Sequence, residues 1–137
     1  ISTACGIAAT HGPTLAVVGD LTLFHDLNAL GLVARHPLTV MVLDNGGGGI
    51  FEHLAEGTLP ELDVGWRTPQ PVDFPGLASA FGLQTCRAGS ANAAAHEALD
   101  GLTNARPRLI HVPIDHAASL AVCREFFATA LAWSTRP

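Results

Sequence analysis

Residues 38–44, Leu-Thr-Val-Met-Val-Leu-Asp, form a continuous apolar run that is rich in branched side chains. A run of this length without polar alternation predicts a β-strand covered on both faces, as is typical of parallel sheets. Three further stretches of strand length lie at residues 14–18, 83–88 and 108–114. The possible folds are therefore limited to those built on short, mostly buried strands.

Helix-like stretches separate these strands. Residues 25–36 have apolar side chains at helical spacing, with Asp26 in the first turn and Arg35 in the last, which suits the helix dipole. Asp73 and Ser90 stand where helix N-caps are expected. The other predicted helices cover residues 1–12, 73–82, 90–105 and 117–133. This alternation predicts an α/β fold, a three-layer parallel sheet with helices on both faces.

The length and the first residues bear on domain organisation. A chain of 137 residues suits one compact domain with its own core. The chain opens directly in a helix-like stretch without an initiator Met. We therefore expect residues 1–137 to be a single domain and a fragment of a longer multidomain protein.

Composition excludes several classes of partner. The net charge is −5, and the basic residues are scattered Arg without any Lys, which argues against nucleic acid as the main partner. The longest apolar runs have strand length, so no membrane span is predicted. The three cysteines lack the paired spacing of metal or redox motifs, which favours reduced, buried thiols in a cytoplasmic protein.

Two of the predicted strands lead into oxygen-donating side chains. Asp20 follows the strand at 14–18, and Asn45 follows the strand at 38–44. One helix separates the two strands, so a right-handed crossover brings their carboxyl ends to the same edge, where ligands bind in such sheets. A carboxylate, an amide and nearby loop carbonyls suit a hard cation such as Mg²⁺ or Ca²⁺.

Four consecutive glycines, residues 46–49, follow directly. They allow three explanations: a phosphate cradle, a metal site with a bulky ligand against the backbone, or a flexible loop. In the first two, the main chain would approach a diphosphate and offer N–H groups and a carbonyl. A Walker loop is excluded because the chain has no Lys, and a dinucleotide fingerprint would need glycine at Phe51 or Glu52.

The spacing of Gly19-Asp20 and Asn45 resembles the metal and diphosphate motif of thiamine-diphosphate enzymes. The general motif has Gly where this chain has Leu21. The stretches GDLTLFHDLNAL and LDNGGGGIF, with STACGIAA before them and RTPQPVDFPGLASAFGL after them, are similar to one branch of that family. This branch comprises the 2-succinyl-5-enolpyruvyl-6-hydroxy-3-cyclohexene-1-carboxylate synthases of menaquinone biosynthesis. The resemblance extends to about Leu83 and is generic beyond it.

The resemblance implies the thiamine-diphosphate-binding fold and a set of site residues. Mg²⁺, or Mn²⁺, would be held by the side chains of Asp20 and Asn45 and the carbonyl of Gly47. Ile50 and Phe51 would line the substrate side. The residues implied to contact the cofactor are Gly19, Asp20, Leu21, Thr22, Asn45, Gly47, Gly48 and Gly49.

Two positions depart from the pattern of that branch. Members often have Asn where this chain has Asp44 and Gly46. A second carboxylate near an anionic diphosphate is unfavourable unless it points away. We therefore expect Asp44 to lie outside the set of metal ligands.

The resemblance also implies a reaction and partners. A transferase of this branch decarboxylates 2-oxoglutarate and adds the resulting succinyl carbanion to isochorismate. The glutamate that activates the cofactor belongs to an N-terminal pyrimidine-binding domain of a partner subunit. This chain would then supply the diphosphate and metal half-site, contain no catalytic residue and be inactive alone. The full-length protein would be a cytoplasmic homodimer or homotetramer.

Two alternatives stay open. The chain could belong to another thiamine-diphosphate branch, such as an acetolactate synthase or a 2-oxoacid decarboxylase, although Leu21 and the GGGGIF ending count against it. It could also be a non-catalytic binding or interaction module that has the fold without the cofactor.

Residues 52–72 lack clear periodicity and are long for a connection, so we expect a lid, a binding loop or a disordered segment. Within this segment, Arg67 would meet a substrate carboxylate or be solvated. Trp66 would cover a neighbouring domain. Asp26 and Asn28 are expected to serve the start of their helix.

The remaining aromatic and imidazole side chains receive structural roles. The histidines match no zinc-ligand spacing, so we expect His25, His53, His111 and His116 at the surface or at strand ends, with His53 also a weak candidate for substrate contact. The aromatic side chains expected in the core are Phe24, Phe81, Phe126, Phe127 and Trp133.

Overall fold

The computed structural model describes residues 1–134, which form two compact units. The first unit consists of residues 1–44 and 71–113. The second unit consists of residues 45–70 and the residues from Ile114 onward.

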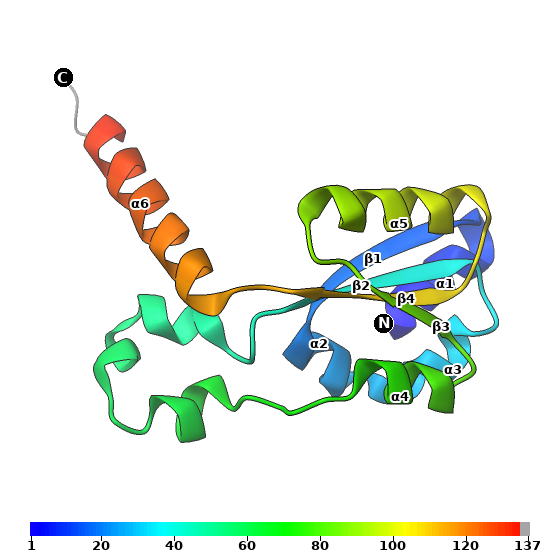
Figure 1. The fold of residues 1–137 in the computed structure, drawn as a ribbon, viewed down its shortest axis with the longest axis horizontal. Helices are drawn as coiled ribbons and strands as arrows, with labels where there is room; N and C mark the ends of the chain where they lie inside the picture. Colours follow the sequence, from blue (N-terminus) through cyan, green and yellow to red (C-terminus); the bar gives the residue numbers. More distant parts are fainter. Residues whose placement is uncertain (135–137) are drawn as a thin grey trace. The chain divides into compact units, whose positions relative to one another are not determined.

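The first unit is built on a parallel sheet (Figure 1). Its strands are β1 (Thr14–Gly19), β2 (Leu38–Asp44), β3 (Gln84–Arg87) and β4 (Arg108–Pro113). Among the described residues they are arranged in the order β1-β2-β4-β3, and each neighbouring pair is parallel. All four predicted strands are thus confirmed.

Helices cover both faces of this sheet, as the sequence predicted (Figure 1). One face packs against α1 (Ser2–His11), α3 (Leu30–Val33) and α4 (Phe74–Ala80). The other face packs against α5 (Ala91–Thr103). The core of the first face includes Leu23, Leu30, Leu38, Val40, Val42, Phe74 and Leu109.

Helix α5 is capped at its N-terminus and is joined to β4 by ion pairs. The Ser90 hydroxyl accepts a hydrogen bond from the Ala93 N–H at 3.2 Å, so the predicted N-cap is confirmed. The buried Arg108 of β4 binds the carboxylates of Glu97 and Asp100 in α5, at 2.7 and 2.5 Å. By contrast, the Asp73 side chain makes no capping hydrogen bond with α4.

The prediction of one helix over residues 25–36 is wrong. The chain instead forms α2 (Asp20–His25), the short 3₁₀ helix η1 (Leu27–Ala29) and α3. Asp26 interrupts the helix because its backbone has φ −130° and ψ 37°, outside the helical region. Its carboxylate accepts hydrogen bonds from the Ser2 N–H at 2.6 Å and the Ser2 hydroxyl at 2.9 Å. Asp26 therefore caps α1, not the helix in which it was expected.

The second unit contains short helical turns and one long helix. The turns are η2 (Gly49–His53), η3 (Ala55–Thr58) and η4 (Leu62–Arg67), of which η4 is π-helical. The long helix is α6 (His116–Ser134), close to the prediction. Most of residues 52–72 thus form short turns, which contradicts the disordered alternative, while the lid and the binding loop stay predictions.

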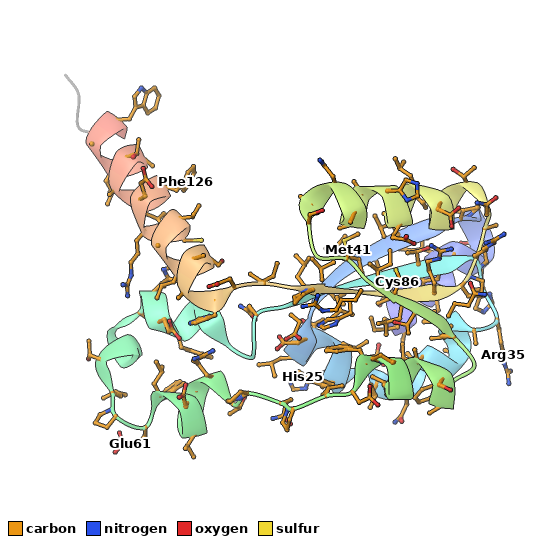
Figure 2. The ribbon with its side chains drawn as sticks, in the orientation of Figure 1. His25, Arg35, Met41, Glu61, Cys86 and Phe126 are labelled. Atoms are coloured by element: carbon orange, nitrogen blue, oxygen red, sulfur yellow. The ribbon has the colours of Figure 1, made fainter. Side chains whose placement is uncertain are left out.

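Three of the aromatic side chains predicted to be buried are exposed. Phe126, Phe127 and Trp133 lie on α6 and expose 56–74% of their surface, and Figure 2 labels Phe126 on that helix. Helix α6 carries apolar side chains all around, so its sequence did not distinguish a buried face. Phe24 is half-buried, and Phe81 is partly buried against the core of the first unit. Within residues 1–134, no helix has the length and apolar character needed to cross a bilayer.

The Asp26 cap predicts a pH dependence of stability. Hydrogen bonds from Ser2, first of all from its backbone N–H, lower the pKa of Asp26 below its ordinary value of 3.8. Because the folded pKa is depressed, this contribution is complete above about pH 4. It is lost as the pH falls toward 2.

The measurement is thermal unfolding of the wild-type chain and of Asp26→Asn between pH 7 and pH 2. We expect Asp26→Asn to lower the Tm by a constant amount above pH 4, and the difference to shrink below it. A difference that is independent of pH throughout this range would contradict the cap.

Candidate diphosphate and metal site

The carboxyl ends of β1 and β2 are neighbours in the sheet. Gly19 pairs with Leu43, so Asp20 and Asp44 follow residues that face each other in the register. Asp20 is the first residue of α2 and is only 3% exposed. Its Oδ1 accepts a hydrogen bond from the Leu21 N–H at 2.9 Å. The strand ends thus bring the carboxylates of Asp20 and Asp44 to one edge of the first unit. Asn45 directly follows Asp44 in the chain.

Asp44 is engaged by a histidine from the adjacent strand. The His111 Nε2 lies 2.8 Å from Asp44 Oδ2, and the His111 ring stacks on Phe74 with the ring centroids 4.1 Å apart. A partner within the sheet agrees with the expectation that Asp44 stays outside a metal's ligands, which remains a prediction. The expectation of a surface or strand-end position for His111 is wrong, because His111 lies inside β4 and is only 17% exposed, and the sequence did not indicate its pairing with Asp44.

The glycine loop, residues 46–49, packs tightly against the end of η4. Gly46 and Gly47 have φ of +76° and +110°, a region that side chains disfavour. A Cβ on Gly47 would overlap the Arg67 carbonyl, and one on Gly48 would lie 2.8 Å from the Trp66 carbonyl oxygen. The glycines are therefore required by the protein's own backbone packing, whatever else they contact.

This packing revises the expected use of the loop N–H groups. The Gly48 N–H donates to the Arg67 carbonyl at 2.8 Å, and the Gly49 N–H donates to the Gly47 carbonyl at 2.9 Å. The Leu21 N–H is likewise bonded to Asp20. The structure therefore does not support the expectation that these three N–H groups are offered to a diphosphate. A Cβ on Gly49 would lie 2.7 Å from Asn45 Nδ2, so Gly49 leaves room for the Asn45 side chain.

Arg67 contacts the glycine loop through its side chain. Its guanidinium binds Glu52 at 3.3 Å and Asp63 at 3.2 Å, and donates to the Gly46 carbonyl at 3.4 Å. The side chain is 19% exposed. The alternative of a solvated loop arginine is therefore wrong, because Arg67 joins three segments of its own unit.

Glu52 is a charged residue of this unit to which the sequence analysis assigned no role. The His116 Nε2, at the start of α6, lies 2.6 Å from Glu52 Oε1, and the Glu52 side chain is only 12% exposed. The two residues are 64 positions apart, so no local spacing rule links them. His116 was expected at the surface or at a strand end; it follows β4 closely in the chain and is partly buried.

A cavity of about 920 Å³ lies in the second unit between η2 and α6. Ile50, which is 67% exposed, lines it together with Glu52 and residues of α6. Phe51 does not line it and packs on Trp66, with ring centroids 5.2 Å apart. The full set of lining residues is Asn45, Gly49, Ile50, Glu52, His53, Leu54, His116, Ser119, Leu120, Cys123, Arg124, Phe127, Ala128 and Leu131.

The side chains of residues 1–134 restrict the kind of metal site that this chain can provide. They contain no group of three or more His, Cys, Asp or Glu that could hold a metal ion. At the ends of β1 and β2 the available ligands are carboxylates, the Asn45 amide and main-chain carbonyl oxygens. Such a ligand set suits a hard cation that retains water or phosphate ligands.

The family of this chain follows from the match of most of its residues to a known domain family. The pattern of the thiamine pyrophosphate enzyme family, C-terminal TPP binding domain, matches residues 1–112. The chain belongs to this family. The recognition made from the Gly19-Asp20 and Asn45 spacing is thereby confirmed.

Two curated relatives of this TPP binding domain have the same enzyme name. The 2-succinyl-5-enolpyruvyl-6-hydroxy-3-cyclohexene-1-carboxylate synthase of Dechloromonas aromatica is 54% identical over 83 residues, covering 61% of this chain and 16% of that protein. The synthase of the same name from Synechococcus elongatus is 37% identical over 133 residues, covering 93% of this chain and 22% of that protein. The chain thus spans about a fifth of the length of these relatives.

Solved structures support the fold of this TPP binding domain. Benzoylformate decarboxylase from Polynucleobacter necessarius matches with a TM-score of 0.69 at 19% identity, over 82% of this chain and 23% of that one. A thiamine diphosphate-dependent 4-hydroxybenzoylformate decarboxylase of Rhodococcus jostii matches with a TM-score of 0.65 at 24% identity, over 80% of this chain and 21% of that one. At these identities the likeness shows the fold, and it confirms the predicted thiamine-diphosphate-binding architecture.

The close packing of the glycine loop predicts a stability effect. Gly48→Ala should destabilise the chain by about 1–3 kcal/mol, because the new methyl group would press on the Trp66 carbonyl and the Phe51 ring. Gly48 has φ −74°, so this variant tests packing without backbone strain.

The matched control is Gly65→Ala, in η4, where nothing lies within 4 Å of the new methyl group. This control should change stability by at most about 1 kcal/mol, in the stabilising direction. Urea unfolding measures both variants. Equal stabilities of the two would show that the loop is loosely packed.

Proposed function

We propose that this chain binds the diphosphate of thiamine diphosphate through one Mg²⁺ ion, or Mn²⁺ in its place. The proposed ligands are a carboxylate oxygen of Asp20, the amide oxygen of Asn45 and the main-chain carbonyl of Gly47. The observation that carries the proposal is the pairing of Gly19 with Leu43, because it sets Asp20 beside the strand end that leads into Asn45. Membership of the TPP binding family agrees with it.

The donor chemistry fits a hard cation on a phosphate. The proposed ligands are all oxygens, and only one of them carries a charge, so the ion would retain positive charge for the diphosphate. Asp20 is buried and held by the Leu21 N–H, so its carboxylate is already oriented. Close packing against η4 fixes the peptide groups of the glycine loop, including that of Gly47.

Other residues would contact the cofactor around this ion. We assign Gly19, Leu21 and Thr22 to the start of α2 beside the diphosphate, with the exposed Thr22 hydroxyl as a further donor. Gly48 and Gly49 would contact it through their glycine Cα atoms and peptide planes, since their N–H groups are bonded within the chain. Asp44 stays with His111, outside the ligand set.

For the complete protein we propose the reaction named for its curated relatives, the synthesis of 2-succinyl-5-enolpyruvyl-6-hydroxy-3-cyclohexene-1-carboxylate from 2-oxoglutarate and isochorismate. The cofactor's thiazolium ring supplies the electron sink for decarboxylation and for transfer of the succinyl group. This chain orients the diphosphate and lines the substrate side through Ile50 and Phe51. It contributes no proton-transferring residue to the reaction.

The remaining parts of the site lie outside this chain in our proposal. An N-terminal pyrimidine-binding domain of a partner subunit would activate the cofactor, so the complete protein would be a homodimer or homotetramer. We place it in the cytoplasm, where its small, charged substrates are available. The isolated chain should therefore bind the cofactor weakly and be inactive.

The metal assignment predicts the effect of removing one carboxylate. Asp20→Ala should weaken Mg²⁺-dependent binding of thiamine diphosphate by about a hundredfold or more, because a direct ligand is lost. Its circular dichroism spectrum should remain that of the wild type. Titration calorimetry of the complete protein, with and without Mg²⁺, measures the affinity.

The control is Asp44→Ala, which removes a carboxylate from the neighbouring strand end. This variant should retain Mg²⁺-dependent affinity within a few-fold, since we place Asp44 outside the metal's ligands. An unchanged affinity in Asp20→Ala, or an equal loss in both variants, would contradict the ligand assignment.

The reaction is tested on the complete protein and on this chain mixed with its N-terminal domain. We expect isochorismate to be consumed with 2-oxoglutarate in the complete protein and in the mixture, and not with this chain alone. Turnover of pyruvate but not of 2-oxoglutarate would assign the protein to the acetolactate synthase or 2-oxoacid decarboxylase branches.

A further inference from the structure

We propose that Glu52 is a positioning residue for the substrate side of the site: its carboxylate holds the segment bearing Ile50 against α6 and η4. This inference rests on the proposed function, which gives Ile50 its role. It concerns contacts within the second unit only.

One carboxylate oxygen joins three elements of that unit. Glu52 lies in the 3₁₀ helix η2, and its Oε1 is 2.6 Å from His116 Nε2 and 3.3 Å from Arg67 Nε. His116 is the first residue of α6, and Arg67 is the last of η4. Because the Glu52 side chain is only 12% exposed, solvent screens these interactions weakly.

The main chain of Glu52 adds a contact to the same helix. Arg124 Nη2, two turns along α6 from His116, donates to the Glu52 carbonyl at 3.5 Å. The residue is thus held to α6 through its side chain and through its backbone. These two contacts are spaced along the helix, so together they restrict rotation of η2 as well as its separation from α6.

The position of Ile50 depends on this attachment. Ile50 and Glu52 are in the same five-residue 3₁₀ helix, so a rotation of η2 moves both side chains. Ile50 is 67% exposed and has little packing of its own to fix it. Both residues line the cavity of about 920 Å³, whose opposite wall is α6. The Glu52 contacts therefore set the shape of the wall that Ile50 presents to a bound substrate.

The same contacts argue against a catalytic role for Glu52. Its Oε1 lies 2.6 Å from His116 Nε2 and 3.3 Å from Arg67 Nε, so these two basic side chains draw this oxygen toward the protein. A general base must reach the proton that it abstracts. Glu52 is therefore a positioning residue, which affects the reaction by fixing the place of Ile50.

The test uses the complete protein with four variants. Glu52→Ala removes the carboxylate, and Glu52→Gln retains an oxygen that can accept from His116. His116→Ala removes the partner and leaves the Arg67 contact, so it keeps the test decisive if Glu52→Ala fails to fold. The matched control is Glu61→Ala, which removes an exposed carboxylate of the same unit (Figure 2).

The measurements are KM and kcat for both substrates, the Kd of thiamine diphosphate with Mg²⁺, and hydrogen exchange of the amides at residues 49–53. For Glu52→Ala we expect a rise in the KM of at least one substrate on the order of tenfold, the loss associated with one hydrogen bond to a charged group. The kcat and the cofactor Kd should change less than about twofold, and Glu52→Gln should recover part of the KM. His116→Ala should raise the same KM, and Glu61→Ala should not.

Unchanged KM values in both Glu52→Ala and His116→Ala would overturn the proposal. A loss of cofactor affinity as large as the change in KM would also overturn it, because it would show a general structural role. If the wild-type protein has no turnover, the proposed function fails, and hydrogen exchange decides the positioning role separately. Faster exchange at residues 49–53 in Glu52→Ala but not in Glu61→Ala supports the attachment, and equal exchange refutes it.

Discussion

The proposed site depends on the parallel pairing of β1 with β2. Their register, Gly19 opposite Leu43, is set by the apolar side chains of both strands, which must face the helices on either side of the sheet. A shift by one residue would turn Val40 and Val42 away from the core and would separate the strand ends. The carboxylate of Asp20 is thus placed by the same apolar contacts that stabilise the first unit. The proposed metal site therefore depends on the burial of aliphatic side chains in the first unit.

The glycine loop illustrates a second constraint, in which packing requires the same residues that we propose for binding. Gly47 and Gly48 meet the carbonyls of Arg67 and Trp66 so closely that a side chain at either position would overlap them. The resulting loop is held by the protein itself, through the Gly48 N–H, and needs no ligand to define it. A rigid loop can present a carbonyl such as that of Gly47 to a cation without the entropic cost of ordering a flexible one. Glu52 extends this rigidity to the helix that bears Ile50.

The sequence predicted the fold well where local patterns determine the structure. The buried strands, the Ser90 cap and the bounds of α6 were predicted from local residue patterns, and the family was recognised from Gly19-Asp20 and Asn45. The interruption at Asp26 was missed because its carboxylate binds Ser2, 24 residues away, and no local rule anticipates that contact. The ion pairs of Glu52 and of Arg108, and the pairing of Asp44 with His111, were missed for the same reason. The exposed aromatic side chains of α6 were misassigned because burial was inferred from residue type alone.

The central claim is that one divalent cation is shared by Asp20, Asn45 and Gly47. The most direct measurement is anomalous diffraction from crystals of the complete protein grown with thiamine diphosphate and Mn²⁺. The account predicts one strong peak within about 2.5 Å of an Asp20 carboxylate oxygen, the Asn45 amide oxygen and the Gly47 carbonyl oxygen. A peak bound to other residues, or a bound cofactor whose metal does not contact Asp20 and Asn45, would contradict it.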